Sequence, residues 1–258
     1  MATIEELQDY LRKSAARSKN VIACPPFHLY LHPTDDFRFF NYAIPDEPVE
    51  GMMPETLRAL RTLFTEHDRE FRLEFLHEYT PLLRPALETL GVGFESENPL
   101  LVCTQESWRA VAGPAALEIR RLHEDSTDEE LAAAINTVNR GFGDEGRDAS
   151  PERIADMRRR IGRGGANYLA LIGGEAVGVG AYTAPFAGLT ELVGIATLPE
   201  YRRQGIAAAV TSEMARDAFE EGVRTAFLTA ADDDASRVYQ RAGFWRIGTG
   251  LAFWEPAS

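Results

Sequence analysis

The apolar and polar positions of residues 116–258 change period several times, and each change predicts a new element. Alternating runs predict strands, whereas apolar residues three or four positions apart predict helices. A pair of glycines, Gly173 and Gly174, separates two apolar runs and is typical of a two-residue hairpin turn. The expected order is a strand at 117–122, a helix from Ser126 to Gly141, a helix after Pro151, a hairpin over 168–183 and a strand at 189–198.

A helical pattern follows. Apolar residues at four-residue spacing predict one buried face of a helix from Gly205 to Glu221, which Gly222 is expected to end. The residues of this face are Ile206, Val210, Met214 and Ala218. After the helix we expect a strand at 225–229, a short helix at 235–242 and a closing pair of strands within 245–254.

The first part of the chain has a similar mixture of elements. The pattern predicts an amphipathic helix at the start, a hairpin over 21–45 around residues 32–36, a helix over 54–66, a strand over 71–76 and a helix ending at Leu90. Phe75 and Phe227 stand 152 positions apart, as do Gly91 and Gly243, which hints at an internal repeat. Chance similarity of two strand-helix-strand units stays open as the alternative.

Length and composition narrow the class of protein. A chain of 258 residues favours two domains or one duplicated domain, and 45% hydrophobic with 26% charged residues is typical of a globular protein. The formal net charge of −13 disfavours nucleic acid and anionic membranes as partners, and suits cationic substrates better.

The expected location is the cytoplasm. No apolar run is long enough to cross a bilayer, and the first residues lack the layout of a secretory signal. The two cysteines, Cys24 and Cys103, lie far apart beside apolar neighbours, as buried thiols do in a reducing compartment. The five histidines are scattered without metal-ligand spacing, so no metal is expected.

The stretch "PEYRRQGIA" joins the strand at 189–198 to the following helix. The first N–H groups of a helix are unpaired and carry partial positive charge, so such a junction can hold phosphates. Gly205 permits close approach of the backbone, Ala207 keeps the first turn slim, and Arg202 and Arg203 add charge. An ordinary turn with solvated arginines is the alternative.

The stretch "IATLPEYRRQGIA" resembles the signature of the GNAT superfamily of N-acetyltransferases, whose phosphate loop reads Q/R-x-x-G-x-G/A. The later stretch "DDDASRVYQRAGF" is similar to the family's helix motif that ends in tyrosine and Gly-Phe. The resemblance covers about residues 116–254 and implies an α/β (α+β) fold: a mixed, mostly antiparallel twisted sheet flanked by helices. We expect a catalytic GNAT domain at 113–258 and a degenerate GNAT-like domain at 1–112, which has no counterpart of "RRQGIA" and would shape the acceptor cleft.

The resemblance also implies a site for acetyl-CoA. The pantetheine arm would pair with the backbone of Ile195, Ala196 and Thr197, and Gly194 is a candidate bulge that opens the strand. The pyrophosphate would lie on Arg202, Arg203, Gln204, Gly205, Ile206 and Ala207. Asp232 and Ser236 belong to the helix motif near the arm, although asparagine often stands where Asp232 does. Three acids at 232–234 are otherwise typical of helix capping rather than a cation site.

Acyl transfer to an amine needs a base, a polarised carbonyl and an acid for the thiolate. The family frequently keeps a carboxylate near Glu191, which would act as the base, while a solvated strand end is the alternative. The family's tyrosine, Tyr239 here, would protonate the sulfur, while a core tyrosine is the alternative. A backbone N–H near Ile195 would polarise the carbonyl.

The expected function is transfer of an acetyl group from acetyl-CoA to a primary amine, by direct attack in a ternary complex. The loop around Phe142, residues 139–146, is a candidate acceptor loop, and the acceptor would be a small-molecule or peptide amine. A non-catalytic acyl-CoA-binding or regulatory module is the alternative, and a homodimer is left open. Presence of both Glu191 and Tyr239 favours the enzyme, because a sensor needs neither.

Overall fold

The computed structural model describes residues 2–144 and 146–256, and the chain divides into two compact units. Unit 1 comprises Leu101–Arg246, and unit 2 comprises Ala2–Leu100 together with the residues from Ile247 onward. Both boundaries fall inside strands, β5 (Phe94–Thr104) and β11 (Trp245–Glu255), so each strand contributes one end to each unit. None of the helices in the described part of the chain is long and apolar enough to cross a membrane.

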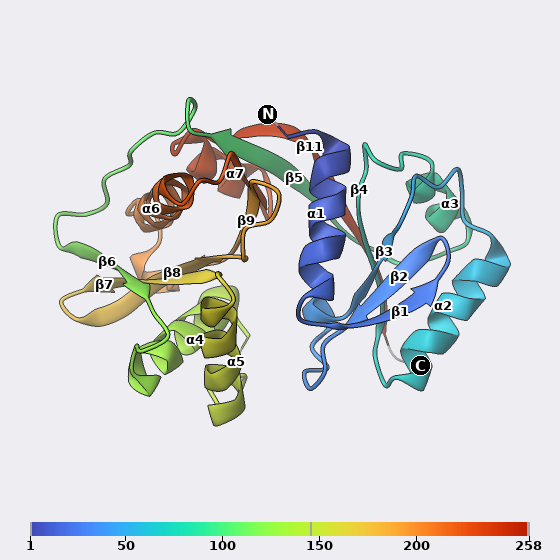
Figure 1. The fold of residues 1–258 in the computed structure, drawn as a ribbon, viewed down its shortest axis with the longest axis horizontal. Coiled ribbons are helices and arrows are strands. Elements are labelled where there is room, and N and C mark those ends of the chain that lie inside the picture. Colours follow the sequence, from blue (N-terminus) through green and yellow to red (C-terminus); the bar gives the residue numbers. More distant parts are fainter. Residues whose placement is uncertain (1, 145, 257–258) are drawn as a thin grey trace. The chain divides into compact units, whose positions relative to one another are not determined.

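Unit 1 is a mixed sheet with helices on both faces (Figure 1). Its strands follow the order β5-β10-β9-β8-β7-β6, with β9 and β10 parallel and β6 to β9 antiparallel. One core cluster lies between the sheet and α6, and a second lies between the sheet and α4 with α5. The elements are β6 (Leu117–Leu122), α4 (Asp128–Phe142), α5 (Pro151–Gly162), β7 (Ala166–Ile172), β8 (Glu175–Tyr182), β9 (Leu189–Thr197), the 3-10 turn η2 (Pro199–Tyr201), α6 (Ile206–Glu220), β10 (Thr225–Thr229) and α7 (Asp233–Gln240).

Helix α6 lies close against the sheet. The four residues of its predicted apolar face are all buried in the same core cluster, which confirms that prediction. Two glycines of β8 allow the close approach: a Cβ atom on Gly180 would lie 2.7 Å from Cε of Met214, and one on Gly178 would lie 3.0 Å from Ile206. The two glycines therefore let α6 pack directly on β8.

Unit 2 contains the same kinds of element. Its strands follow the order β1-β2-β3-β4-β11, with β3 and β4 parallel and the other pairs antiparallel. A separate apolar core joins α2 and α3 to this sheet. The elements are α1 (Ile4–Ala16), β1 (Asn20–Cys24), β2 (Phe27–Leu31), the 3-10 turn η1 (Arg38–Phe40), β3 (Tyr42–Pro45), α2 (Pro54–Glu66), β4 (Phe71–Leu76) and α3 (Leu83–Thr89).

Two predictions in these regions need correction. The hairpin around residues 32–36 exists as the antiparallel pair β2 and β3, but a further hairpin, β1 with β2, precedes it. The closing pair of strands is wrong, because β11 is one strand that pairs with β4 from Leu76 to Phe71. Its internal glycine Gly248 makes room for a neighbour rather than a turn, since a Cβ there would lie 2.7 Å from Oε2 of Glu78.

The repeat of 152 positions has structural support. It places the strand-helix-strand series β10, α7 and β11 on β4, α3 and β5. Gly91 and Gly243, which correspond under this shift, both have left-handed φ angles, 71° and 92°. The two series thus share a local order of strand, helix and strand, and the internal repeat stays a prediction.

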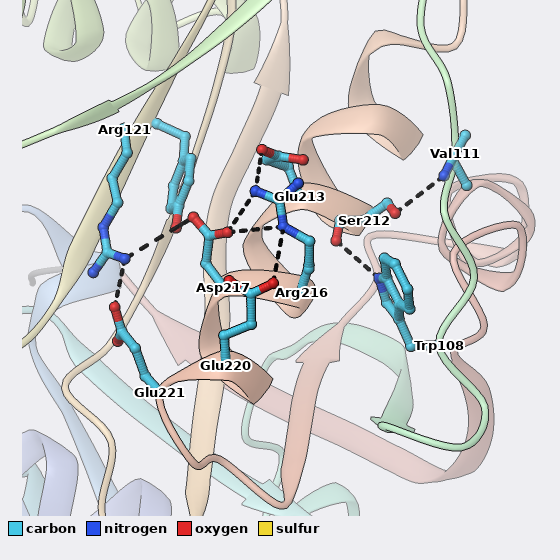
Figure 2. Close-up of polar contacts among 10 residues, drawn as sticks. Trp108, Val111, Arg121, Ser212, Glu213, Arg216, Asp217, Glu220 and Glu221 are labelled. Carbon is cyan, nitrogen blue, oxygen red and sulfur yellow. Dashed lines mark hydrogen bonds and ion pairs between the residues drawn. The ribbon is translucent and has the colours of Figure 1, made fainter.

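A polar network ties α6 to strands β6 and β7 of the sheet (Figure 2). The hydroxyl of Tyr168, a fully buried residue, donates to Oδ2 of Asp217 at 2.7 Å, and Arg121 forms an ion pair with Glu221 at 2.5 Å. Burial, the neighbouring Tyr182 and the bond to Asp217 raise the pKa of Tyr168. On the other side, Trp108 donates from Nε1 to the carbonyl of Ser212 at 3.0 Å, so the segment after β5 is also tied to α6.

We expect Asp217→Ala to destabilise the protein by about 1–3 kcal/mol, because the buried hydroxyl of Tyr168 would lose its acceptor. Glu213→Ala serves as control, since its ion pair with Arg216 lies on the surface and is worth at most about 1 kcal/mol. Urea unfolding curves of the two variants measure the difference. Equal midpoints for both variants would contradict a stabilising role of the buried bond.

Candidate active site

Strand β9 carries a bulge in its second half. Ala196 pairs with Val179 and Val193 pairs with Ala181, so Gly194 and Ile195 together oppose one residue of β8. Gly194 has a φ of 61°, the left-handed value that a glycine adopts most easily in such a bulge. The predicted bulge is confirmed.

The bulge reverses which face each later residue of β9 occupies. Leu192 packs in the core beside α6, whereas Ala196, four positions on, packs in the core beside α4 and α5. Strict alternation would place both on one face. Ile195 therefore packs on the α6 side, where the coenzyme is expected.

Strands β9 and β10 separate beyond the start of β9. Within the described residues, their parallel ladder joins Leu189–Glu191 to Thr225–Phe227. Strand β9 then continues to Thr197 along β8 alone. The backbone of Ile195, Ala196 and Thr197 thus lies past the last pair with β10, as an extended ligand needs for pairing to that edge.

The loop from η2 into α6 has an unusual backbone. Gly205 is the N-cap of α6 with a φ of 85°, and Arg203 has a φ of 63°. A Cβ atom on Gly205 would meet no heavy atom within 4 Å among the described residues. Thr127 of α4 and Asp232 of α7 cap their helices with side chains, but no side chain in the described part of the chain caps α6. The first N–H groups of α6 therefore have no side-chain cap, and the position of a Cβ atom on Gly205 beside them is open.

The side chains of this loop differ in their roles. Arg202, Arg203 and Gln204 are exposed, whereas Ile206 is buried in the core. Arg202 donates from Nε to the carbonyl of Thr197 at 3.2 Å and from Nη2 to the carbonyl of Gly141 at 2.7 Å. The sequence motif did not predict these two contacts, because the acceptors are main-chain atoms of distant segments.

Tyr239 lies on α7 and packs, partly buried, against the same core cluster as Ile195 and Ile206. Burial first, and then the negative charge of Asp232, raises the pKa of Tyr239 to about 12. The phenol is therefore protonated at neutral pH and can donate a proton.

The other two predicted residues of the α7 motif serve the helix itself. Oδ1 of Asp232 accepts from the backbone N–H of Ala235 at 2.7 Å, so this carboxylate is an N-cap, as its place before a helix indicates. Ser236 is buried in the first turn, and its N–H donates to the carbonyl of Asp232 at 2.9 Å. Contacts of either residue with a coenzyme stay a prediction.

Glu191 is the last residue of β9 that pairs with β10. Its backbone is bonded to Thr183 in both directions: Thr183 N–H donates to its carbonyl at 2.9 Å, and its own N–H donates to Oγ1 of Thr183 at 3.2 Å. The backbone of this candidate base is thereby fixed where the two strands begin to separate.

The end of α4 contacts the second half of β9. A Cβ atom on Gly141 would lie 2.7 Å from Cβ of Ala196, so the glycine permits direct packing on the bulged strand. Phe142, the next residue, is 58% exposed. Of the candidate acceptor loop at 139–146, Glu145 lies outside the described residues. The sequence analysis took Gly141 as the end of the helix and missed its close packing on β9, whereas α4 continues to Phe142.

The comparisons with known proteins identify a family for part of the chain. Residues 128–244 match the model of the Acetyltransferase (GNAT) family, and the fold is similar to that of a solved GCN5-related N-acetyltransferase. Accordingly, this segment is a GNAT acetyltransferase domain. No curated protein matches the chain.

Several solved structures are similar over most of the chain. A GCN5-related N-acetyltransferase from Kribbella flavida is 27% identical, with a TM-score of 0.80, over 100% of this chain and 97% of that one. A GCN5-related N-acetyltransferase from Sphaerobacter thermophilus is 16% identical, with a TM-score of 0.65, over 89% of this chain and 76% of that one. A tandem GNAT protein from the clavulanic acid biosynthesis pathway is 16% identical, with a TM-score of 0.60, over 90% and 79%. The last two show the fold alone.

Proposed function

We propose that the protein transfers an acetyl group from acetyl-CoA to a primary amine by direct attack in a ternary complex, with the segment 113–258 carrying the chemistry. The observation that carries this proposal is the combination of two features: β9 leaves β10 after Glu191, and α6 begins beside that strand at an uncapped, left-handed Gly205. A strand edge and a helix start in this arrangement suit an extended arm followed by a diphosphate.

The binding roles follow from these features. Backbone groups of Ile195, Ala196 and Thr197 pair with the pantetheine arm. The N–H groups of Arg203 to Ala207 bind the diphosphate, helped by the dipole of α6 and the charge of Arg203, while the N–H of Arg202 donates to the carbonyl of Pro199 at 3.3 Å. Asp232 and Ser236 lie at the start of α7, where they border the arm.

The chemical roles fall to groups next to this arm. Acetyl-CoA supplies the acetyl group as a thioester. Glu191 accepts the proton of the amine, directly or through water. The N–H near Ile195 donates to the thioester carbonyl oxygen as negative charge develops there. Tyr239, which its raised pKa keeps protonated at neutral pH, donates its phenolic proton to the departing sulfur.

The acceptor class is an amine of a small molecule or peptide. The net charge of −13 favours cationic molecules near the protein, and amines are mostly cationic before they lose a proton. Fold does not select among amines.

The experiment is a thermal-shift titration with acetyl-CoA, followed by measurement of free-thiol release against a panel of amines. Stabilisation by acetyl-CoA and thiol release with at least one amine are expected. Stabilisation without release across the panel would favour a non-catalytic acyl-CoA-binding module. No stabilisation would contradict both functions.

A further inference from the structure

The side chain of Arg202 joins three segments of unit 1. Its backbone belongs to the loop before α6, its Nε binds the carbonyl of Thr197 at the end of β9, and its Nη2 binds the carbonyl of Gly141 in the last turn of α4. The last four carbonyls of a helix lack partners within the helix, and a cation there is favourable. Residues 202–207, from the end of η2 into the first turn of α6, are called the coenzyme loop here. Arg202 of this loop thus gives a carbonyl at the end of α4 a hydrogen-bond partner.

The end of α4 has little freedom apart from this contact. Gly141 is buried against Ala196, with room for no Cβ atom. The last turn closes through the N–H of Gly143 to the carbonyl of Arg140 at 3.2 Å and the N–H of Asp144 to the carbonyl of Asn139 at 2.9 Å. A displacement of the Arg202 guanidinium would therefore remove its hydrogen bond to the Gly141 carbonyl and disturb this turn.

The segment Arg147–Ala149 is attached to the same helix. Oδ1 of Asn136 accepts from the N–H of Ala149 at 2.7 Å, and Nδ2 of Asn139 donates to the carbonyl of Arg147. Both asparagines belong to α4. The segment after α4 therefore follows any movement of the helix end.

We propose that Arg202 is a positioning residue that couples occupation of the coenzyme loop to the order of the α4 end and the Arg147–Ala149 segment, which form the acceptor side. This inference rests on the proposed function. When the diphosphate fixes the N–H groups of the loop, Arg202 is fixed with them and holds the carbonyl of Gly141. The side chain of Arg202 then acts on the acceptor side, while the charge next to the diphosphate comes from Arg203.

The reciprocity of binding free energies gives this proposal a measurable form. Acetyl-CoA should slow hydrogen exchange not only in the loop but also at the amides of Gly143 and Asp144. The amine should in turn bind more tightly to the protein that holds acetyl-CoA. Both effects depend on the guanidinium of Arg202.

The test is hydrogen-exchange mass spectrometry of the full chain with and without saturating acetyl-CoA, combined with calorimetry. In the wild type, acetyl-CoA should protect peptides that span 139–149. In Arg202→Ala this protection should disappear, while the dissociation constant for acetyl-CoA changes by less than about threefold, under 1 kcal/mol. Arg202→Lys, which can reach one carbonyl, should keep part of the protection. With any active amine, Arg202→Ala should raise the KM for the amine more than that for acetyl-CoA.

Glu200→Gln is the matched control. Glu200 pairs with Arg140 at 3.2 Å and links η2 to the same end of α4, but both side chains are more than half exposed. A surface pair of this kind is worth little, so the control should keep the wild-type protection.

Three results would overturn the proposal. One is a wild type that binds acetyl-CoA without protection of 139–149. Another is an Arg202→Ala variant that loses about tenfold or more in acetyl-CoA affinity yet keeps the protection at saturation, since its side chain would then be a phosphate ligand. The third is a wild type with no calorimetric signal for acetyl-CoA, which would also remove the proposed function. If Arg202→Ala does not fold, Arg202→Lys and Arg202→Gln carry the same comparison.

Discussion

Tyr239→Phe is expected to lower kcat for acetyl transfer by about 100-fold or more, the range that loss of a general acid produces. The phenyl ring keeps the packing of Tyr239 against the core beside α6, so only the hydroxyl is removed. Affinity for acetyl-CoA should change by less than about threefold, because the diphosphate and arm are held by backbone groups elsewhere. Thiol release under saturating amine, with calorimetry of acetyl-CoA, measures the two quantities separately.

Tyr201→Phe is the control for this change. Tyr201 also packs partly against that core and lies just before the coenzyme loop, but its hydroxyl donates to Oε2 of Glu175 at 2.8 Å on the surface. It should keep wild-type turnover. Wild-type turnover of Tyr239→Phe would remove this residue from the mechanism.

The pH dependence supplies a second check on Tyr239. Its folded-state pKa of about 12 lies above the ordinary phenol value, so the proton is present throughout the neutral and moderately alkaline range and is lost only as the pH approaches that value. A fall in kcat between neutral and mildly alkaline pH would therefore belong to another group. Such a fall that disappears in Tyr239→Phe would contradict the assigned pKa.

Much of the secondary structure of unit 1 could be predicted from the local sequence pattern. The helix from Gly205 to Glu221, the turn at Gly173 and Gly174, and the bulge at Gly194 were each predicted from residues within a few positions of one another. These features depend on backbone conformation and on one buried face, which a local sequence encodes directly.

Features that depend on residues far apart in the sequence could not be predicted from the local pattern. Strand β11 was expected to fold back on itself, but it pairs with β4, about 180 positions earlier, and the hydrophobic periodicity does not identify such a partner. Arg202 shows the same limit within the site. The motif identifies the charge of Arg202. It cannot predict that this side chain binds the carbonyls of Thr197 and Gly141, because a motif specifies side-chain types and not main-chain partners.

Gly205→Val is expected to weaken acetyl-CoA binding by at least about tenfold. A branched side chain at the left-handed φ of 85° costs about 1–2 kcal/mol, so the loop would relax and move the N–H groups of Gly205 and Ile206 away from their present directions. The new side chain would also enter the open space beside Gly205 where the diphosphate is expected. About 1.4 kcal/mol of lost binding energy corresponds to the tenfold change, which calorimetry with acetyl-CoA resolves.

A glycine at the other end of α6 provides a control that distinguishes the effect of backbone strain from the loss of the diphosphate site. Gly222, just past the other end of α6, has a φ of 90° and equally open surroundings among the described residues. Gly222→Val should therefore cost similar stability in urea unfolding while acetyl-CoA affinity stays at the wild-type value. Equal losses of affinity in both variants would mean that strain in α6, rather than the N–H groups at its start, controls binding. Unchanged affinity in Gly205→Val would exclude the start of α6 as the diphosphate site, because a bound diphosphate leaves no room for the added side chain.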